Sequence, residues 1–337
     1  MGGSSIAYHL RPHKAVDRRL FFDLLTRFQR WKSLSDAVYI SMGAFPLEDH
    51  RLAHRILGLT RLIAFDREET VVARQRFNKP IESCHCLCKT SDEVVSDLDG
   101  ILKDCGFPNP ERVVVWLDYT DPKQIGEQVR EFQTLIGKLN EGDFVRVTVN
   151  ANPKELAPVS YTGAALVTKT MRNQFDQIKL RIGDYLPSSA SPADMTSEGL
   201  SLILAQAFAS ASLKALPFSG DIVFAPLSIV RYTDTTQMLS ISGALVHKKR
   251  EKRVRRRLGM SSWPFSSENW SDIRNLVVPS LTLRERLFLE REITEKNDEE
   301  IIDALGFSSA GEIDIKIFLE SYKRYYRFYP TILPVEL

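Results

Sequence analysis

A chain of 337 residues, 43% of them hydrophobic, is long enough to bury a large core. Its 45 basic and 43 acidic residues nearly cancel, so any attraction to nucleic acid must come from local clusters of charge. No apolar run reaches the roughly 18 residues of a membrane span, and the first residues lack the apolar stretch of a secretion signal. With only four cysteines, three of them closely spaced, we expect a cytoplasmic protein with reduced thiols.

The first half of the chain alternates short apolar runs with segments of helical periodicity. An amphipathic helix at residues 15–31 precedes the first strand. Strands are predicted at residues 37–42, 61–65, 81–88, 112–117 and 143–149. Helices are predicted between and after them at residues 47–57, 70–77, 91–105 and 122–139. Successive βα units of this kind indicate a parallel sheet covered by helices.

The pattern changes after the fifth strand. Residues 168–183 and 197–216 have helical patterns, and strands at 222–232 and 237–246 are joined by a short polar segment, so they form an antiparallel hairpin. We therefore predict an α/β protein with a Rossmann-like, mostly parallel sheet that ends in an antiparallel hairpin, plus an N-terminal helix and a C-terminal helical extension. The predicted parts are a helical lead-in at 1–35, an α/β domain at 36–246, and a basic segment with a helical extension at 247–337.

Beyond the hairpin, the sequence predicts helices and no further strand. Thr282 and Glu285 fit a capping box for a helix to residue 293, and further helices are predicted at residues 298–305 and 312–328. Three aromatic residues near the end have helical spacing, which favours packing in a core over a base-stacking surface: Tyr322, Tyr325 and Tyr329.

Five βα units followed by an antiparallel hairpin resemble the class I S-adenosylmethionine-dependent methyltransferases over about 210 residues. The resemblance implies S-adenosylmethionine as the cofactor and methyl transfer to an oxygen or nitrogen of an acceptor. A dinucleotide-binding dehydrogenase would continue with parallel strands and would show G-x-G-x-x-G after the first strand, which this chain lacks. A phosphate-binding G-x-x-x-x-G-K-[ST] loop is also absent from the sequence.

Ligands of Rossmann-like sheets bind at the carboxyl ends of the strands. The resemblance places Ser41 and Gly43, at the end of the first strand and in the loop that follows, beside the cofactor, although the family commonly has several small residues there. Asp66 ends the second strand, where the family usually keeps an acidic residue that accepts hydrogen bonds from both ribose hydroxyls, and Glu68 is the fallback. The alternative is that Asp66 begins a solvated helix.

Asp118 and Tyr119 follow the fourth strand, where the resemblance implies residues near the methyl group and the acceptor. Asp118 is expected to orient or deprotonate a hydroxyl or amine, while alignment of the reacting groups supplies much of the rate. The Asn/Asp-Pro-Pro-Tyr motif of amino-group DNA methyltransferases and the Pro-Cys motif of cytosine methyltransferases are absent here. An N-terminal basic segment that includes Lys14 is a candidate clamp for an anionic ligand, or a salt-bridged helix start.

No metal site is expected. Cys84, Cys86 and Cys88 share one face of a predicted strand, His85 points away from them, and the C-x-x-C spacing typical of zinc sites is missing. Glu48, Asp49 and His50 follow the first loop, and they either reach the same cleft or form a polar helical face.

The strongest charge signal comes after the hairpin. It consists of Lys248, Lys249, Arg250, Lys252, Arg253, Arg255, Arg256 and Arg257. Counterion release makes such clusters good ligands for a phosphate backbone, so RNA or DNA is a candidate partner. Alternatively, the run is an exposed loop of solvated charges. The alternative function is a catalytically inactive methyltransferase-like scaffold that binds nucleic acid or a protein through this run and the helical tail.

Overall fold

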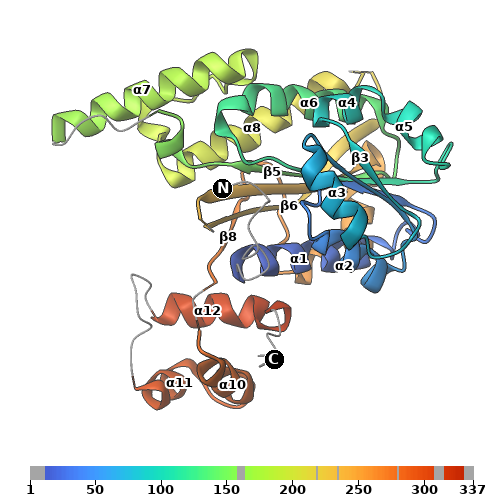
Figure 1. Ribbon diagram of the computed structural model, residues 1–337. Coiled ribbons are helices and arrows are strands. Elements are labelled where there is room, and N and C mark those ends of the chain that lie inside the picture. Colours follow the sequence, from blue (N-terminus) through green and yellow to red (C-terminus); the bar gives the residue numbers. More distant parts are fainter. Residues whose placement is uncertain are drawn as a thin grey trace.

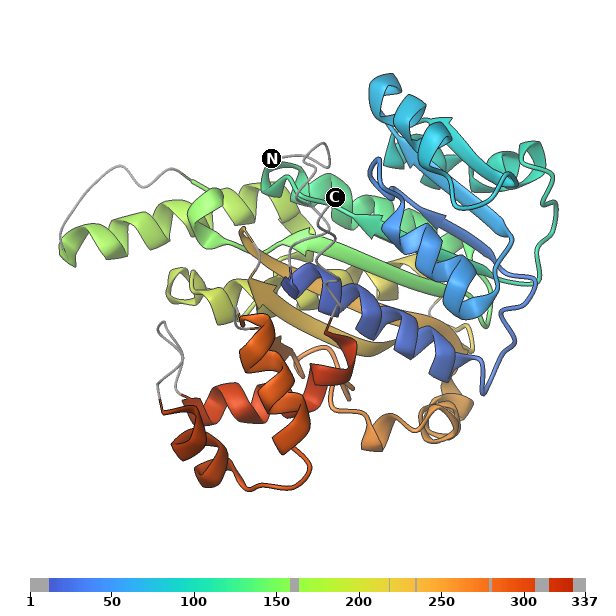
Figure 2. The same cartoon turned by 60° about the horizontal axis from the view of Figure 1, so that its bottom comes forward.

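The computed structural model describes residues 12–157, 164–217, 219–233, 235–278, 281–306 and 315–329, of which 164–168 by their backbone. A single sheet runs through the molecule, with helices packed on its two faces (Figures 1 and 2). Its strands are β1 Val38–Ser41, β2 Arg61–Asp66, β3 Cys84–Cys88, β4 Val113–Asp118, β5 Phe144–Asn150, β6 Ile222–Thr233, β7 Gln237–His247 and β8 Arg274–Leu276. The α-helices are α1 Pro12–Phe28, α2 Glu48–Leu57, α3 Glu69–Asn78, α4 Ser91–Ser96, α5 Leu98–Asp104, α6 Ile125–Lys138, α7 Ala164–Ile182, α8 Ser197–Ala215, α9 Glu251–Leu258, α10 Leu283–Glu292, α11 Asp298–Leu305 and α12 Ile315–Tyr325.

The strand order is β3-β2-β1-β4-β5-β7-β6-β8. Strands β1 to β5 pair in parallel, and β7 is antiparallel to both of its neighbours, β5 and β6. The chain moves outward from β1 to β3 and then crosses back to β4, so the order reverses between β1 and β4. The prediction of a Rossmann-like, mostly parallel sheet with a terminal antiparallel hairpin is therefore confirmed.

Three details differ from the sequence prediction. The C-terminal segment contributes strand β8, which pairs in parallel with β6, so the expectation of no further strand is wrong. Three residues are too few to create a periodic signal. The single helix expected at 91–105 is two helices, because the backbone of Asp97 (φ −117°, ψ 36°) leaves the helical region. The basic run is no loop: it forms a short 3₁₀ turn, Lys248–Arg250, and helix α9, which buries Val254 and Leu258.

Alternation along the strands divides the core into two layers. Tyr39, Trp116 and Phe144 face the side covered by α1, whereas their neighbours Ile40 and Val115 face the side covered by α6 and α8. Helices α10 to α12 lie on the α1 side, and helix α7 projects away from the sheet (Figure 1). No described helix combines the length and apolar character needed to cross a bilayer.

The C-terminal helices join the core on the α1 side. Tyr322 and Tyr325 are fully buried and belong to the same apolar cluster as residues of α1. Arg19 of α1 donates a hydrogen bond to the carbonyl oxygen of Tyr329 at 3.0 Å. The aromatic residues near the end of the chain therefore pack in a core, as their helical spacing predicts.

A buried ion pair fastens α1 to the sheet. The Arg146 guanidinium on β5 donates a hydrogen bond to the Asp17 carboxylate, and the two side chains are 4% and 1% exposed. Arg146 also donates to Ser242 on β7 at 3.0 Å and lies 4.7 Å from the ring centroid of Trp116. Ser240 on β7 donates a longer hydrogen bond of 3.3 Å to Asp17. The ion pair therefore joins α1 to β5, and two serines of β7 form hydrogen bonds with it.

We predict that Asp17→Asn lowers the free energy of unfolding by about 3–5 kcal/mol, because it leaves the Arg146 charge buried without its anionic partner. Urea denaturation measures the change. The matched control is Asp23→Asn on the same helix, which removes a partly exposed i,i+4 pair with Arg27 and should cost less than about 1 kcal/mol. Equal, small losses in the two variants would contradict this role for Asp17.

Candidate functional site

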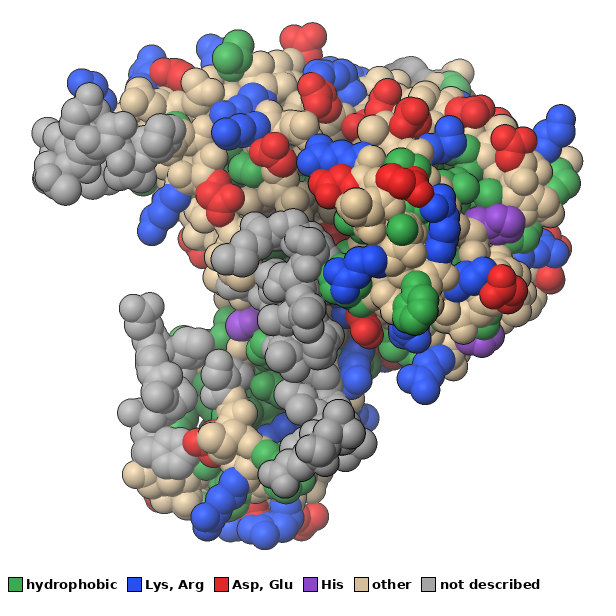
Figure 3. Space-filling view, viewed as in Figure 1, with side chains coloured by type: hydrophobic (Ala, Val, Ile, Leu, Met, Phe, Trp, Pro, Cys, Tyr) green, Lys and Arg blue, Asp and Glu red, His purple; other side chains and the backbone are tan. Residues whose placement is uncertain are grey.

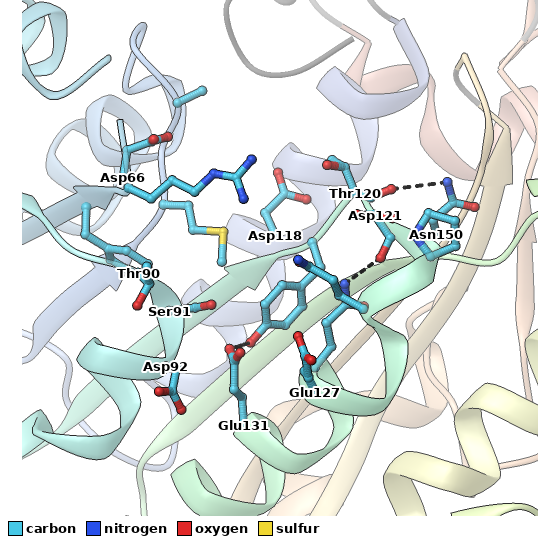
Figure 4. Close-up of a pocket in the computed structure, with 18 of the residues that line it drawn as sticks. Asp66, Thr90, Ser91, Asp92, Asp118, Thr120, Asp121, Glu127, Glu131 and Asn150 are labelled. Atoms are coloured by element: carbon cyan, nitrogen blue, oxygen red, sulfur yellow. Dashed lines mark hydrogen bonds between the residues drawn. The ribbon is translucent and has the colours of Figure 1, made fainter. Parts of the chain in front are cut away.

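A cavity of about 880 Å³ opens at the carboxyl ends of the parallel strands (Figure 4). Its walls come from the residues that follow β1 to β5, from the turn between β6 and β7, and from Lys14 at the start of α1. It therefore spans the point where the strand order reverses, which is the usual ligand position in open α/β sheets. Its size lies within the range of pockets for small organic ligands.

Asp66 lies on the cavity wall at the end of β2, with Thr90, Ser91 and Asp92 after β3 on the same side (Figure 4). The Asp66 Oδ1 atom accepts a hydrogen bond from the backbone N–H of Glu68 at 2.9 Å. Burial raises the pKa of Asp66, and this hydrogen bond partly offsets the effect. A carboxylate has about four acceptor positions, so Asp66 retains capacity for further donors from a ligand.

The loop after β1 turns sharply beside the cavity. Met42 and Ala44 line the wall, whereas Ser41 and Gly43 lie outside the described lining. Ser41 is 1% exposed, and its side chain interacts with the buried Tyr39 and Asp49 behind the loop. The backbones of Gly43 (φ 67°) and Ala44 (φ 46°) are both left-handed. Such a conformation is rare for alanine and is often found at functional sites.

Gly43 is small because of its packing. A Cβ atom at this position would lie 2.7 Å from Leu47 Cδ2 and 2.8 Å from His50 Cε1. On the other side, Gln75 of α3 donates hydrogen bonds to the carbonyl oxygens of Met42 and Ala44 at 2.9 and 3.1 Å. The loop is thus held by packing against Leu47 and His50 on one side and by the hydrogen bonds of Gln75 on the other. These contacts keep its shape constant at the cavity wall.

A buried polar network supports this loop. Asp49 Oδ2 accepts a hydrogen bond from Tyr39 at 2.9 Å, and Asp49 Oδ1 lies 3.2 Å from His50 Nδ1. His50 Nε2 lies 3.1 Å from the carbonyl oxygen of Ile63, so both ring nitrogens face acceptors, as an imidazolium requires. Burial acts to lower the pKa of His50, but the Asp49 carboxylate outweighs it and the pKa is raised. Asp49 and His50 are buried, so they neither line the cavity nor form a polar surface face, and both expectations for these two residues are wrong. They support the loop from the core.

The raised pKa of His50 predicts a pH dependence of stability. The contribution of the His50 charge is fully present below the unfolded-state pKa of 6.5 and is lost as pH rises through the higher folded-state value. Wild type should therefore lose up to about 1.4 kcal/mol of unfolding free energy per pH unit more than His50→Gln in that window. Urea denaturation from pH 6 to 9 measures both. Parallel pH profiles for the two proteins would show that His50 is neutral in the folded state.

At the end of β4, Asp118 forms an ion pair with Lys14 of α1. Lys14 Nζ lies 2.7 Å from Asp118 Oδ2, and the two side chains are 7% and 16% exposed. Tyr119 also lines the cavity, but its hydroxyl donates a hydrogen bond to Glu131 of α6 (Figure 4). Burial, reinforced by Glu131, raises the pKa of Tyr119 well above its usual value, so the phenol stays protonated.

Sequence reasoning missed the wall formed by β5 and the hairpin. Asn150 at the end of β5 donates hydrogen bonds to Glu155 at 2.8 Å and to the carbonyl oxygen of Thr120 at 3.3 Å. Thr236 of the hairpin donates to the same Glu155 carboxylate, and Asn152 donates to it at 3.1 Å. The position of Asn150 at a strand end was the available signal, but its partner Glu155 lies in a loop without a pattern.

Acidic side chains outnumber basic ones around the cavity. Of its described lining residues, eight are acidic and three are basic. The acidic ones are Asp66, Glu68, Asp92, Asp118, Asp121, Glu127, Glu131 and Glu155. Opposite charges attract strongly in partly enclosed sites, so the cavity suits a ligand with positive charge.

The structure brings four of the six predicted site residues to one cavity: Asp66, Glu68, Asp118 and Tyr119. Ser41 and Gly43 adjoin it from behind the first loop. The three cysteines of β3 share one face, from buried Cys84 to exposed Cys88, and no described group of His, Cys, Asp and Glu residues has the arrangement of a metal site.

Comparison with known proteins finds a family model that matches almost the whole chain. Residues 6–337 match the model of a family described as "Putative O-methyltransferase". No curated protein matches the sequence at a significant level.

Several solved structures show a distant likeness to this chain. A DUF574 family protein from Streptomyces avermitilis has a TM-score of 0.37 at 12% identity, over 68% of this chain and 82% of that chain. The plantazolicin methyltransferase, in complex with a triazolic desmethylPZN analog and SAH, has a TM-score of 0.33 at 9% identity, over 68% and 85%. A variant of the 16S rRNA (adenine(1408)-N(1))-methyltransferase from Catenulisporales acidiphilia has a TM-score of 0.32 at 10% identity, over 66% and 91%. These likenesses are too distant to assign a residue or a ligand.

Proposed function

Because this chain belongs to that family of O-methyltransferases, we propose that it transfers a methyl group from S-adenosylmethionine to an oxygen atom of an acceptor. The observation that carries the proposal is the position of the cavity. It lies at the carboxyl ends of β1, β2 and β4, where the strand order reverses, with a carboxylate at the end of β2.

The cofactor end of the cavity is formed by the residues after β1, β2 and β3. Asp66 would accept hydrogen bonds from the ribose hydroxyls, since its carboxylate has acceptor capacity beyond its hydrogen bond with the Glu68 N–H. Glu68 lies beside it on the same wall. The excess of acidic side chains fits a ligand that carries a sulfonium and an ammonium group, and it would disfavour an anionic nucleotide cofactor.

The acceptor end lies at β4, next to Lys14. When bound, S-adenosylmethionine supplies the methyl group, and the acceptor oxygen gains that group while it loses its proton. In this proposal the Asp118 carboxylate would accept the hydroxyl proton, and the Lys14 ammonium, 2.7 Å from it, would stabilise negative charge on the acceptor oxygen. Tyr119 shapes the wall between the two ends, because its hydroxyl is bound to Glu131.

Asp66→Ala should weaken the binding of S-adenosylmethionine and S-adenosylhomocysteine by about 10- to 100-fold, because hydrogen bonds to a charged acceptor contribute about 1.5–3 kcal/mol. Isothermal titration calorimetry measures the two affinities. The matched control is Glu82→Ala, which removes an exposed carboxylate outside the cavity and should leave both affinities unchanged. A folded wild-type protein that binds neither compound at millimolar concentration would refute the proposed function and favour the inactive-scaffold alternative.

Asp118→Asn should lower kcat at least 100-fold in a methyl-transfer assay with an acceptor found by screening hydroxyl compounds, since general base catalysis contributes about 10² to 10⁴. Its affinity for S-adenosylhomocysteine should remain within about threefold of wild type, because the carboxylate serves the acceptor. The comparison variant Asp121→Asn alters a neighbouring carboxylate that caps a 3₁₀ turn. Equal kcat values for wild type and Asp118→Asn would remove Asp118 from the mechanism.

A further inference from the structure

The basic run lies at the amino ends of the central strands, opposite the cavity at their carboxyl ends. Strand β7 runs antiparallel to β5, so the chain leaves it at the amino end of β5, and α9 follows there. Strand β5 has seven residues, which places this surface about 23 Å from the cavity edge. A ligand bound on α9 therefore does not occupy the catalytic cavity.

Two segments far apart in the sequence build this surface. The Arg257 side chain donates a hydrogen bond to the carbonyl oxygen of Arg30, and Arg30 donates in return to the carbonyl oxygen of Leu258 at 3.4 Å. Figure 2 shows the segment after β7 beside the end of α1. We call this the amino-edge basic surface, and its exposed members are Arg30, Lys248, Lys249, Arg250, Lys252, Arg253, Arg256 and Arg257.

Most of its charge is not neutralised by the protein. Arg255 faces inward, donating to the carbonyl oxygens of Ser267 and Pro226 and to Glu251, so it is excluded from the surface. Three basic residues are exposed on the outer face of α9: Lys252, Arg253 and Arg256. Within the described chain, no acidic side chain forms an ion pair with any of them. By contrast, acidic and basic side chains are interspersed over the helices at the top of Figure 3.

The two tryptophan rings near the surface are covered in part or almost fully by other side chains. Trp31 is covered by the Lys32 ammonium, 5.3 Å from its centroid, and packs edge-on against Phe28. Trp263 is 5% exposed and has the Arg27 guanidinium 5.7 Å above its ring. Proteins that bind single strands combine basic grooves with exposed aromatic rings, whereas sequence-independent binding of a double helix comes essentially from contacts with its phosphates.

We propose that the amino-edge basic surface binds the phosphate backbone of a nucleic-acid double helix. The arginine and lysine side chains of α9, together with Arg30, contact phosphates and release counterions, with no contact to base edges. Binding there is independent of sequence and leaves the cavity open. The proposal does not depend on methyl transfer, because the two sites lie at opposite ends of the sheet.

Fluorescence anisotropy of the full chain with labelled RNA and DNA duplexes of about 20 base pairs, roughly two helical turns, tests the proposal. The triple variant Lys252→Ala, Arg253→Ala and Arg256→Ala should lose at least tenfold in affinity, and its log–log salt slope should flatten by about 2–3. The matched control carries the same loss of charge on exposed residues of α5, α6 and α7: Lys103→Ala, Arg130→Ala and Lys179→Ala. It should bind like wild type.

Tight, salt-sensitive binding of either duplex that only the α9 variant loses would establish the surface, and the two duplexes decide between RNA and DNA. Equal affinity of the α9 variant and the control would overturn the proposal. So would binding of a single strand as tight as that of the duplex, or binding only to anionic phospholipid vesicles. Circular dichroism of both variants checks their folding, and S-adenosylhomocysteine binding checks the cavity separately.

Discussion

The buried ion pair between Asp17 and Arg146 fixes the position of helix α1, and both the cavity and the basic surface depend on that position. Two opposite charges in a nearly dry core require each other, because either one alone carries a large desolvation penalty. Helix α1 is therefore held in one position across β5. Lys14 precedes Asp17 by three residues on the same helical face, so the core pair also carries Lys14 to Asp118 at the cavity wall. The last turn of the same helix leads to Arg30 beside α9.

The direction of the parallel strands separates two kinds of chemistry. At the carboxyl ends, strands finish in polar side chains that gather around one cavity, and acidic groups dominate there. At the amino ends, the antiparallel strand β7 is followed by the basic helix α9. The two charge distributions are kept apart by the length of the sheet, so a positively charged cofactor and a polyanion would not compete for one site. The loop after β1 supports the first site through left-handed backbone at Gly43 and Ala44 and a buried network beneath it.

Much of the fold follows from the sequence because buried strands leave a strong pattern. Apolar runs such as residues 113–117 mark central strands, and the hairpin predicts the antiparallel β6 and β7. Asp66 and Asp118 could be placed at the cavity because strand ends in a parallel sheet meet at one edge. Contacts between distant segments have no such pattern. The pairing of Lys14 with Asp118 and of β8 with β6, and the burial of Ser41 behind the loop, depend on tertiary packing that local periodicity does not encode.

A crystal structure of the protein with S-adenosylhomocysteine tests most directly whether the cavity at the carboxyl ends of the strands is the cofactor site. The expected result is the ligand in that cavity, with its ribose hydroxyls within hydrogen-bond distance of the Asp66 carboxylate and its sulfur directed toward Asp118. Ligand bound at another surface, or a cavity without ligand in crystals grown at a saturating concentration, would contradict the assignment of this cavity to methyl transfer.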